Sequence, residues 1–357
     1  MQVQCDTDPA VFDRLRDEWE ALLSRSVTPA PFLRPFWQKA WWTAYQQGKT
    51  LRLITVREGE RLVGIAPLFL HEMRVAVGEL LPRLSIERPE PLPEGAARRI
   101  LHPLGGTEVS DYLDLIVDRE QAGAVYAALW DFLKGQGDWE LLDLHCLPSG
   151  SPTLEALPRL AQASGWRAET VQEEVCPIIA LPASWEAYLD SLDKKQRHEI
   201  RRKIRKAERE ASVRWRVSGG ADELEADLEL FFRLHERSDP AKEAFWNAET
   251  RQFFRTIAGA LQQDQALQLS FIYFDEQPVA TYFSLLHDGQ MLLYNSGYEP
   301  GLFMSLSPGL VLLSYMIEDA IQRGYRIFDF MRGNERYKYD YGGVDRPIYR
   351  LGIAPAS

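Results

Sequence analysis

The feature that most constrains the fold of this 357-residue chain is an internal repeat. Residues 51–71 align without a gap on residues 267–287, and in each segment two apolar runs flank a short polar turn. This pattern predicts one β-hairpin in each half of the chain. The matched residues are Leu51, Leu53, Glu60, Val63, Leu70 and His71 in the first copy and Leu267, Leu269, Glu276, Val279, Leu286 and His287 in the second.

The repeat continues after the hairpins, because each copy goes on with a strand, a helix and a second strand. The predicted elements are strand 112–117, helix 122–134 and strand 139–146 in the first copy, and a strand through Tyr294, helix 310–323 and strand 325–331 in the second. The order predicts a duplicated α/β unit. We place the first domain at 1–180 and the second at 181–357.

Three further elements are predicted in the first half. Pro9 to Leu23 has the pattern of an acidic amphipathic helix, and a second helix covers Arg34 to Tyr45. The tryptophans of the second helix recur at helical spacing, which predicts an aromatic face packed into a core. The stretch from Pro82 to Gly106 is rich in Pro, Arg and Glu and is interpreted as an irregular insertion.

Composition excludes several classes of protein. The start of the chain lacks the pattern of a signal peptide, and no apolar run reaches transmembrane length. Cys5, Cys146 and Cys176 are widely spaced and form no metal-ligand motif, so we expect a cytoplasmic protein without a metal. The net charge of −11 argues against a general nucleic-acid binder.

The charge is unevenly distributed. Residues 194–209 hold nine Lys or Arg and two Glu, within a predicted basic linker helix over 193–211. Arg197, Arg201 and Arg205 form a ridge at i, i+4 spacing. One interpretation is a solvated helix that joins two domains. The other is a contact with a polyanion: a tRNA, a nucleotide-linked acceptor or an acidic membrane surface.

The start of helix 310–323 is a candidate phosphate site. Ser307-Pro308-Gly309 precedes it, with Ser as the predicted N-cap, Pro in the first turn and Gly permitting close approach of a ligand. Free N–H groups and the positive end of the helix dipole favour an anion there. The first copy has Asp118-Arg119-Glu120 near the same point, and its carboxylates would repel a phosphate.

Taken together, several motifs resemble the CelD-like branch of the GNAT acyltransferase superfamily, which is related to the Fem-type aminoacyl transferases. They are the tryptophan-rich helix near the N-terminus, the basic helix, the Ser307-Pro308-Gly309 helix start and a closing run from Asp329 to Lys338 (DFMRGNERYK). The resemblance implies two tandem GNAT-like domains with mixed sheets flanked by helices. The usual pyrophosphate loop of Q/R-x-x-G-x-G/A type is absent, and Ser307-Pro308-Gly309 would replace it.

The resemblance also implies roles for single residues. Acyl transfer to an amine needs a base for the nucleophile and a proton source for the leaving group. Asp329 and Glu335 are candidate bases, Tyr337 a candidate acid and Lys338 a candidate phosphate or carboxylate ligand. Each also has a structural interpretation: Asp329 as an internally bonded carboxylate, Tyr337 as a packed loop aromatic, and Glu335 and Lys338 as surface charges. The donor-binding candidates are Ser307, Pro308, Gly309, Leu310, Tyr294 and Asn295, and the acceptor-binding candidates are Tyr298, Arg197, Arg201 and Arg205.

Three functions follow as hypotheses. The first is an N-acyltransferase that uses acetyl-CoA or another acyl-CoA as donor and a small-molecule or nucleotide-linked amine as acceptor. The second is a Fem-type transferase that uses aminoacyl-tRNA. The third is a non-catalytic GNAT-like module for binding or assembly.

Overall fold

In the computed structural model, which describes residues 1–75, 80–81 and 95–356, the chain packs as two compact units. The first unit comprises Met1–Glu174 and Arg346–Ser357, and the second comprises Val175–Asp345. The last strand of the chain therefore belongs mainly to the unit in which the chain begins.

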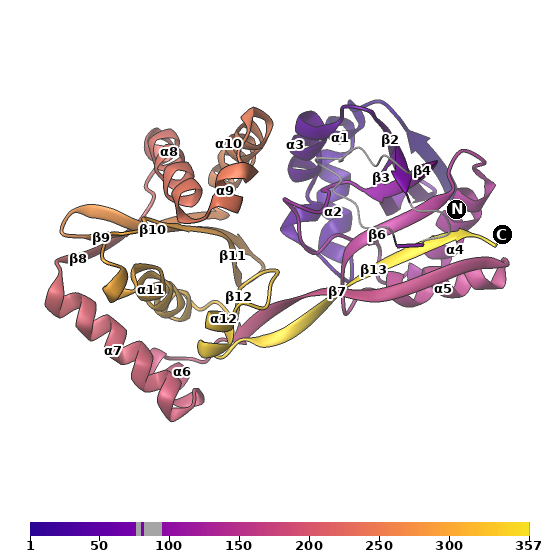
Figure 1. Ribbon diagram of the computed structural model, residues 1–357. Helices are drawn as coiled ribbons and strands as arrows, with labels where there is room; N and C mark the ends of the chain where they lie inside the picture. The colour runs from indigo at the N-terminus through magenta and orange to yellow at the C-terminus, as the bar shows by residue number, and fades with distance from the viewer. Residues whose placement is uncertain (76–79, 82–94, 357) are drawn as a thin grey trace. The chain divides into compact units, whose positions relative to one another are not determined.

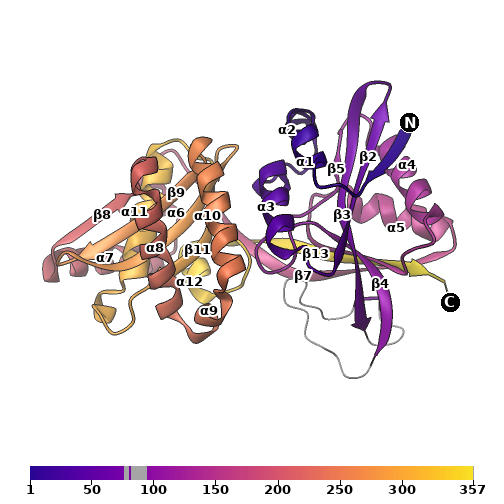
Figure 2. The same cartoon turned by 90° about the horizontal axis from the view of Figure 1, so that it is seen from above.

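The first unit is built on a mixed sheet in which β4 and β6 pair in parallel and the other strand pairs described below are antiparallel. Its strands, in spatial order, are β1 (Gln2–Asp6), β2 (Lys49–Glu58), β3 (Arg61–Val75), β4 (Ala96–Pro103), β6 (Leu141–Pro148) and β13 (Val344–Pro355), while β5 (Ile116–Val117) pairs with β3. Helices α1 (Val11–Arg14), α2 (Arg16–Arg25) and α3 (Pro35–Tyr45) cover one face, and α4 (Ala122–Gly135) and α5 (Thr153–Ala163) cover the other (Figure 2). Both faces are therefore buried.

The second unit repeats this arrangement, with β11 and β12 in parallel beside antiparallel pairs. Its strands, in spatial order, are the second part of β7 (Trp166–Ala180), β12 (Ile327–Asp329), β11 (Gln290–Tyr298), β10 (Gln277–His287), β9 (Leu267–Phe274) and β8 (Val213–Val217). The first part of β7, up to Glu174, belongs to the first unit. One face carries α8 (Ala221–Ser238), α9 (Pro240–Phe245) and α10 (Ala248–Gln263), and the other carries α6 (Trp185–Ser191), α7 (Lys194–Glu210) and α11 (Pro308–Gln322), with the short α12 (Arg336–Asp340) after β12 (Figure 1).

The duplicated unit predicted from the sequence is confirmed. Residues 51–71 lie in the hairpin β2–β3 and residues 267–287 form the hairpin β9–β10. In each unit a further strand, a helix and a last strand follow, and the last strands are β6 and β12. The prediction of two α/β units with mixed sheets is therefore correct.

Three predicted elements differ from the structure. The helix predicted from Pro9 to Leu23 is two helices, because Leu15 leaves helical geometry with φ −97° and ψ 0°. The strand predicted over 112–117 is only Ile116–Val117, since Tyr112 has a positive φ of 52° that a strand cannot accommodate. Of the predicted insertion 82–106, residues 82–94 lie outside the described residues, and Ala96–Pro103 is strand β4.

Helices α3 and α7 show how side-chain spacing sets the packing. Trp37 and Trp41 are fully buried, as their spacing in α3 predicts. On α7, Ile200 and Ala207 are buried against the core, while Asp193 caps the first turn and pairs reciprocally with Gln196 in a capping box. The predicted basic helix is therefore packed along one stripe, and its charged residues lie on the remaining faces.

Candidate active site

Helix α11 begins with a backbone that leaves its first amide groups open. Ser307 has left-handed dihedral angles (φ 54°, ψ 56°), and its side chain makes no capping hydrogen bond, so the expected side-chain cap is absent. Pro308 has no N–H, and none of the described residues accepts a hydrogen bond from the N–H of Gly309 or Leu310. These two N–H groups lie at the positive end of the helix dipole, which favours an anion.

The carbonyl groups of the same turn are held by tyrosines. The Tyr282 hydroxyl donates to the Gly309 carbonyl oxygen at 3.2 Å, and the Tyr341 hydroxyl donates to the Leu310 carbonyl oxygen at 2.7 Å. The loop ahead of the helix is also anchored, because the Lys206 ammonium on α7 donates to the Ser305 carbonyl oxygen at 2.9 Å. The first turn of α11 is therefore fixed in position before any ligand arrives.

A cavity of about 310 Å³ opens beside this turn, and we call it the β11 cavity. Ser296 and Tyr298 on β11 line one side of it, and residues 307–310 line another. The complete lining is Tyr282, Ser296, Tyr298, Met304, Ser307, Pro308, Gly309, Leu310 and Tyr337. The left-handed, non-glycine Phe303 and Ser307 flank it, and such strained backbones often occur at ligand sites.

A β-bulge determines which residues of β11 face this cavity. Asn295 pairs with Phe283 and Leu293 pairs with Ser284, so Tyr294 is the extra residue of the bulge. The Tyr294 ring stacks on Phe254 of α10, with ring centroids 5.6 Å apart. Because side chains alternate after the bulge, Ser296 and Tyr298 lie on the face of α11 while Asn295 lies on the face of α8.

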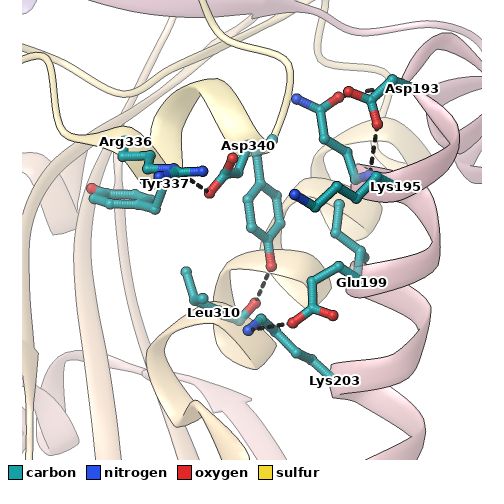
Figure 3. Close-up of a pocket in the computed structure, with 11 residues that line it drawn as sticks. Asp193, Lys195, Glu199, Lys203, Leu310, Arg336, Tyr337 and Asp340 are labelled. Carbon is teal, nitrogen blue, oxygen red and sulfur yellow. Dashed lines mark hydrogen bonds and ion pairs between the residues drawn. The ribbon is translucent and has the colours of Figure 1, made fainter.

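A second and larger cavity of about 560 Å³ lies between α7, α12 and the start of α11, and we call it the α7 cavity. Its lining is Asp193, Lys195, Gln196, Glu199, Ile200, Lys203, Leu310, Arg336, Tyr337, Asp340 and Tyr341. The Lys203 ammonium pairs with Glu199 at 3.0 Å, whereas the Lys195 ammonium extends into the cavity with no partner among the described residues (Figure 3). The cavity is therefore lined by both acidic and basic side chains, and the Lys195 ammonium is a cation that no described carboxylate neutralises.

The two cavities share Leu310 and Tyr337. Tyr337 is half-buried, its ring meets Phe330 edge-on with centroids 6.2 Å apart, and in Figure 3 its hydroxyl points away from α7. No described residue forms a hydrogen bond with this hydroxyl. Burial, and then the charge of Glu335, raise the Tyr337 pKa above its ordinary value. The phenol therefore remains protonated at neutral pH and is available as a donor.

The comparison with known protein families decides what kind of unit carries these cavities. Residues 194–339 match the acetyltransferase (GNAT) domain. This stretch is therefore similar to a GNAT domain, and we refer to it as the GNAT domain. It contains both cavities except for Asp193, Asp340 and Tyr341 at the margin of the α7 cavity.

Solved structures show that the fold of the whole chain, and not only of the GNAT domain, is shared. FemX is similar with a TM-score of 0.62 at 11% identity, covering 98% of this chain and 97% of that one. A protein of unknown function from Bacteroides thetaiotaomicron has a TM-score of 0.56 at 11% identity over 99% and 100% of the two chains. L-PGS from Bacillus licheniformis has a TM-score of 0.52 at 12% identity over 99% and 94%.

Neither a curated relative nor a membrane-spanning helix was found, the latter among the described residues. No curated protein matches this sequence. Within residues 1–75, 80–81 and 95–356, no helix has both the length and the hydropathy that a membrane span requires.

Within the GNAT domain, Asp329 and Lys338 are internally bonded. Asp329 is fully buried, and its carboxylate accepts a hydrogen bond from the Met331 N–H at 2.8 Å. The Lys338 side chain is 2% exposed, and its ammonium donates to the carbonyl oxygens of Met331, Arg332 and Gly333 at 3.0, 2.8 and 3.1 Å. Glu335 is more than half exposed and pairs with Lys338 at 2.9 Å. Lys338 therefore fixes the loop that leads to Tyr337.

The remaining predicted residues divide between the cavities and other places. Ser307, Pro308, Gly309, Leu310 and Tyr298 line the β11 cavity, whereas Tyr294 and Asn295 do not. Asn295 instead accepts a hydrogen bond from His235 of α8 at 3.1 Å. Arg197 and Arg201 pair with Asp190 and Glu186, and Arg205 donates to the Arg201 carbonyl oxygen. This arginine ridge lines neither cavity.

Several lining residues were not singled out in the sequence. Lys195 and Lys203 line the α7 cavity from α7, and Arg336 does so from α12. For the two lysines, the sequence pattern that could have indicated this position is the i, i+4, i+8 spacing of Lys195, Glu199 and Lys203, which forms a second charged face of the same basic helix. Tyr282 and Ser296 carried no signal, because strand alternation alone cannot indicate on which side of a bulge a residue lies.

Proposed function

We propose that the GNAT domain transfers an acyl group from an acyl-CoA thioester, acetyl-CoA in the simplest case, to an amine by direct attack on the acyl carbon. One observation carries the proposal. Two cavities meet at Leu310 and Tyr337, beside two open N–H groups at the start of a helix. A donor with a charged nucleotide end and a less polar acyl end matches this arrangement.

The proposed donor spans both cavities. Its diphosphate accepts hydrogen bonds from the N–H groups of Gly309 and Leu310, and the helix dipole stabilises the negative charge. The nucleotide end occupies the α7 cavity, where Lys195 provides a positive charge. Lys203 and Arg336 lie in the same cavity and pair with the carboxylates of Glu199 and Asp340. The acyl end occupies the β11 cavity, with Ser296 and Tyr298 beside it.

The chemistry then needs two proton transfers. The amine attacks the thioester carbonyl, the C–N bond forms, the C–S bond breaks, and the departing thiolate takes up a proton. Tyr337 is the proposed donor to the sulfur, because its phenol is protonated and its hydroxyl is unpaired. Glu335 is the proposed acceptor of the amine's proton through water, since its carboxylate is exposed and close enough to influence Tyr337. Asp329 and Lys338 are proposed to position the loop between them.

The test uses two glycines that occupy equivalent places. Gly309 is the second residue of α11 and Gly123 is the second residue of α4, and a Cβ would meet no close neighbour at either position. A carboxylate in a first helical turn stabilises the helix, so Gly309→Glu and Gly123→Glu should both fold. Only Gly309→Glu should abolish donor binding, because its carboxylate would lie where the diphosphate binds.

The measurement is thermal unfolding with acetyl-CoA and with CoA. Ligand at one hundred times its Kd stabilises the native protein by about 2.7 kcal/mol, which gives a clear rise in Tm for the native chain and for Gly123→Glu. No rise in the native chain with any CoA thioester would refute the proposal.

A second candidate function is transfer from aminoacyl-tRNA. It is favoured by the similarity to FemX over almost the whole chain and by the basic surface of α7. Binding of tRNA should then weaken steeply as salt is raised. Replacing Arg197, Arg201 and Arg205 with Gln should reduce the slope of that dependence while leaving the CoA-induced rise in Tm unchanged. If neither CoA thioesters nor tRNA bind, the non-catalytic module remains as the interpretation.

A further inference from the structure

A buried group of two histidines and one aspartate lies in the first unit, which contains no part of the proposed transfer site. His102 is on β4, and Asp143 and His145 are on the neighbouring strand β6. The parallel register pairs Leu101 with Leu142, so His102 lies next to Asp143, and His145 follows two residues later on the same face. One potential ligand atom from each side chain lies within 4.8 Å of the others.

His102 is the unexplained member of this group. It is 0% exposed, and neither of its ring nitrogens forms a hydrogen bond with any described residue. Its Nδ1 lies 3.5 Å from Oδ2 of Asp143, and its ring packs against Phe69 with centroids 5.5 Å apart. A buried imidazole without a partner is costly, because it has lost its hydrogen bonds to water without replacement.

The other two members are held by further polar side chains. The His145 Nε2 lies 3.0 Å from Asp143 Oδ2, and its Nδ1 lies 2.9 Å from a carboxylate oxygen of Glu173. Arg350 on β13 donates two hydrogen bonds of 2.7 Å to the Asp143 carboxylate. Metal-binding histidines commonly have a carboxylate on the second ring nitrogen, and metal-binding carboxylates are commonly hydrogen-bonded. Glu173 and Arg350 are in these positions.

We infer that His102, Asp143 and His145 form a binding site for a divalent transition-metal ion of the zinc class. Two imidazoles and one carboxylate are a donor set that Zn²⁺ accepts. A tetrahedral ion with bonds of about 2.0–2.1 Å separates its ligand atoms by about 3.3 Å, close to the separations of 3.0 and 3.5 Å on Asp143 Oδ2.

Binding of the metal ion would replace a proton. The hydrogen bond between His145 Nε2 and Asp143 Oδ2 holds a proton, and the metal ion takes its place between the same two atoms. One proton is therefore released as the ion binds, and His145 becomes a neutral ligand whose Nδ1–H continues to donate to Glu173. His102 gains its missing partner in the same step. The ion would link β4 to β6.

The experiment is a metal analysis of the full chain, produced without a polyhistidine tag in medium supplemented with Zn²⁺ or with Co²⁺. We expect about one metal ion per chain, and the Co²⁺ protein should show the visible absorption of a tetrahedral site. His102→Leu should remove both signals, and the Tm of the native chain should fall on prolonged chelation while that of His102→Leu does not change. His198→Leu is the control, because His198 lies on an exposed part of α7, and it should retain the metal.

The alternative is that His102 binds no metal. If His102 is only an unpaired core residue, His102→Leu replaces it with an apolar side chain and should raise the Tm above that of the native chain. A native chain that contains no metal under either condition, together with such a rise, would overturn the inference. Retention of metal by a folded His102→Leu would overturn it as well, because the ion would then be elsewhere.

Discussion

Tyr337 illustrates how one residue joins packing to proposed chemistry. Its half-buried ring packs against the core beside Phe330, whereas its hydroxyl has no partner among the described residues. Tyr337→Phe removes only the hydroxyl, so the free energy of unfolding should change little. If this phenol protonates the departing thiolate, kcat should fall by about 10²-fold or more while KM for the acyl-CoA stays within a few-fold. Release of free thiol measures both constants.

The neighbouring tyrosine provides the control for that substitution. The Tyr339 hydroxyl donates to Asp345 at 2.7 Å, and Tyr339 lines neither cavity. Tyr339→Phe should leave kcat unchanged. An equal loss of activity in both variants would mean that the loop tolerates no change, and would remove the support for a specific role of Tyr337.

A histidine in the second unit should make stability depend on pH. The Trp246 indole N–H donates to His235 Nδ1 at 3.0 Å, so Nε2 carries the hydrogen that is donated to Asn295. Burial, and then the charge of Lys242, lower the His235 pKa from 6.5 to about 3. The unfolded chain therefore binds this proton below pH 6.5 while the folded protein does not, and stability falls as the pH is lowered from about 6.5 towards 3.

The size of this effect can be isolated with a variant. Gln at position 235 can also accept from Trp246 and donate to Asn295, but it does not titrate. Between pH 7.5 and pH 5.5 the native chain should lose about 1.4 kcal/mol more than His235→Gln. Urea unfolding at the two pH values measures the difference. Parallel losses in the two proteins would show that His235 is not the group responsible.

At the scale of elements, the close approach of β11 and α8 depends on one glycine. A Cβ at Gly297 would lie 2.5 Å from the His235 backbone nitrogen and 2.6 Å from its Cα, and a backbone cannot move aside as a flexible side chain can. Gly297→Ala should therefore separate α8 from the sheet and destabilise the protein by about 1–3 kcal/mol. Gly123→Ala, in open space on α4, should instead stabilise it slightly. Urea midpoints give both values.

Elements whose signals are local were predictable from the sequence, whereas contacts between strands far apart in the sequence were not. The hairpins, α3, α4, α7 and α11 were found from turn residues, periodicity and helix limits. Strand β4 was missed because its outer half, Ala96 to Arg99, is mostly exposed and consists of two alanines and two arginines, whereas Ile100 to Pro103 is buried. The place of Lys338 beneath three carbonyl groups follows from the folding of loop 331–335, which no sequence period indicates.

Of the candidate site, the sequence predicted the parts that depend on a local motif and not those that depend on how distant elements pack. The start of α11 and Tyr337 follow from a local motif, so residues 307–310 were identified. Which charged face of α7 lines a cavity depends on the rotation of the helix, and the sequence favoured the arginine ridge because the Lys195–Lys203 face also contains Glu199. The meeting of His102 and Asp143 depends on the register of two parallel strands, which is set by the whole sheet.

At the scale of the whole molecule, the sheet of the first unit is completed by a strand from the distant end of the sequence, whereas the second unit is one continuous segment. Strand β12 of the second unit pairs with β7, and β6 of the first unit pairs with β13 at the other end of the sequence. Strands β7 and β13 occupy equivalent places, since β7 lies antiparallel to β12 and β13 lies antiparallel to β6. The first unit therefore cannot be a simple N-terminal domain, because its sheet lacks one strand until residue 355 has been made.

This arrangement makes the end of the chain essential for the fold of its beginning. Deleting residues 346–357 removes the buried Ile348, Leu351 and Ile353, exposes the edge of β6, and leaves the buried Asp143 without Arg350. Loss of a buried ion partner alone typically costs about 3–5 kcal/mol, so the first unit should unfold. Seven of the ten tryptophans lie in that unit, so the fluorescence spectrum of the deletion should resemble that of the denatured protein. Removing only residues 356–357 should leave the native spectrum, and a native spectrum in the longer deletion would show that β13 is dispensable.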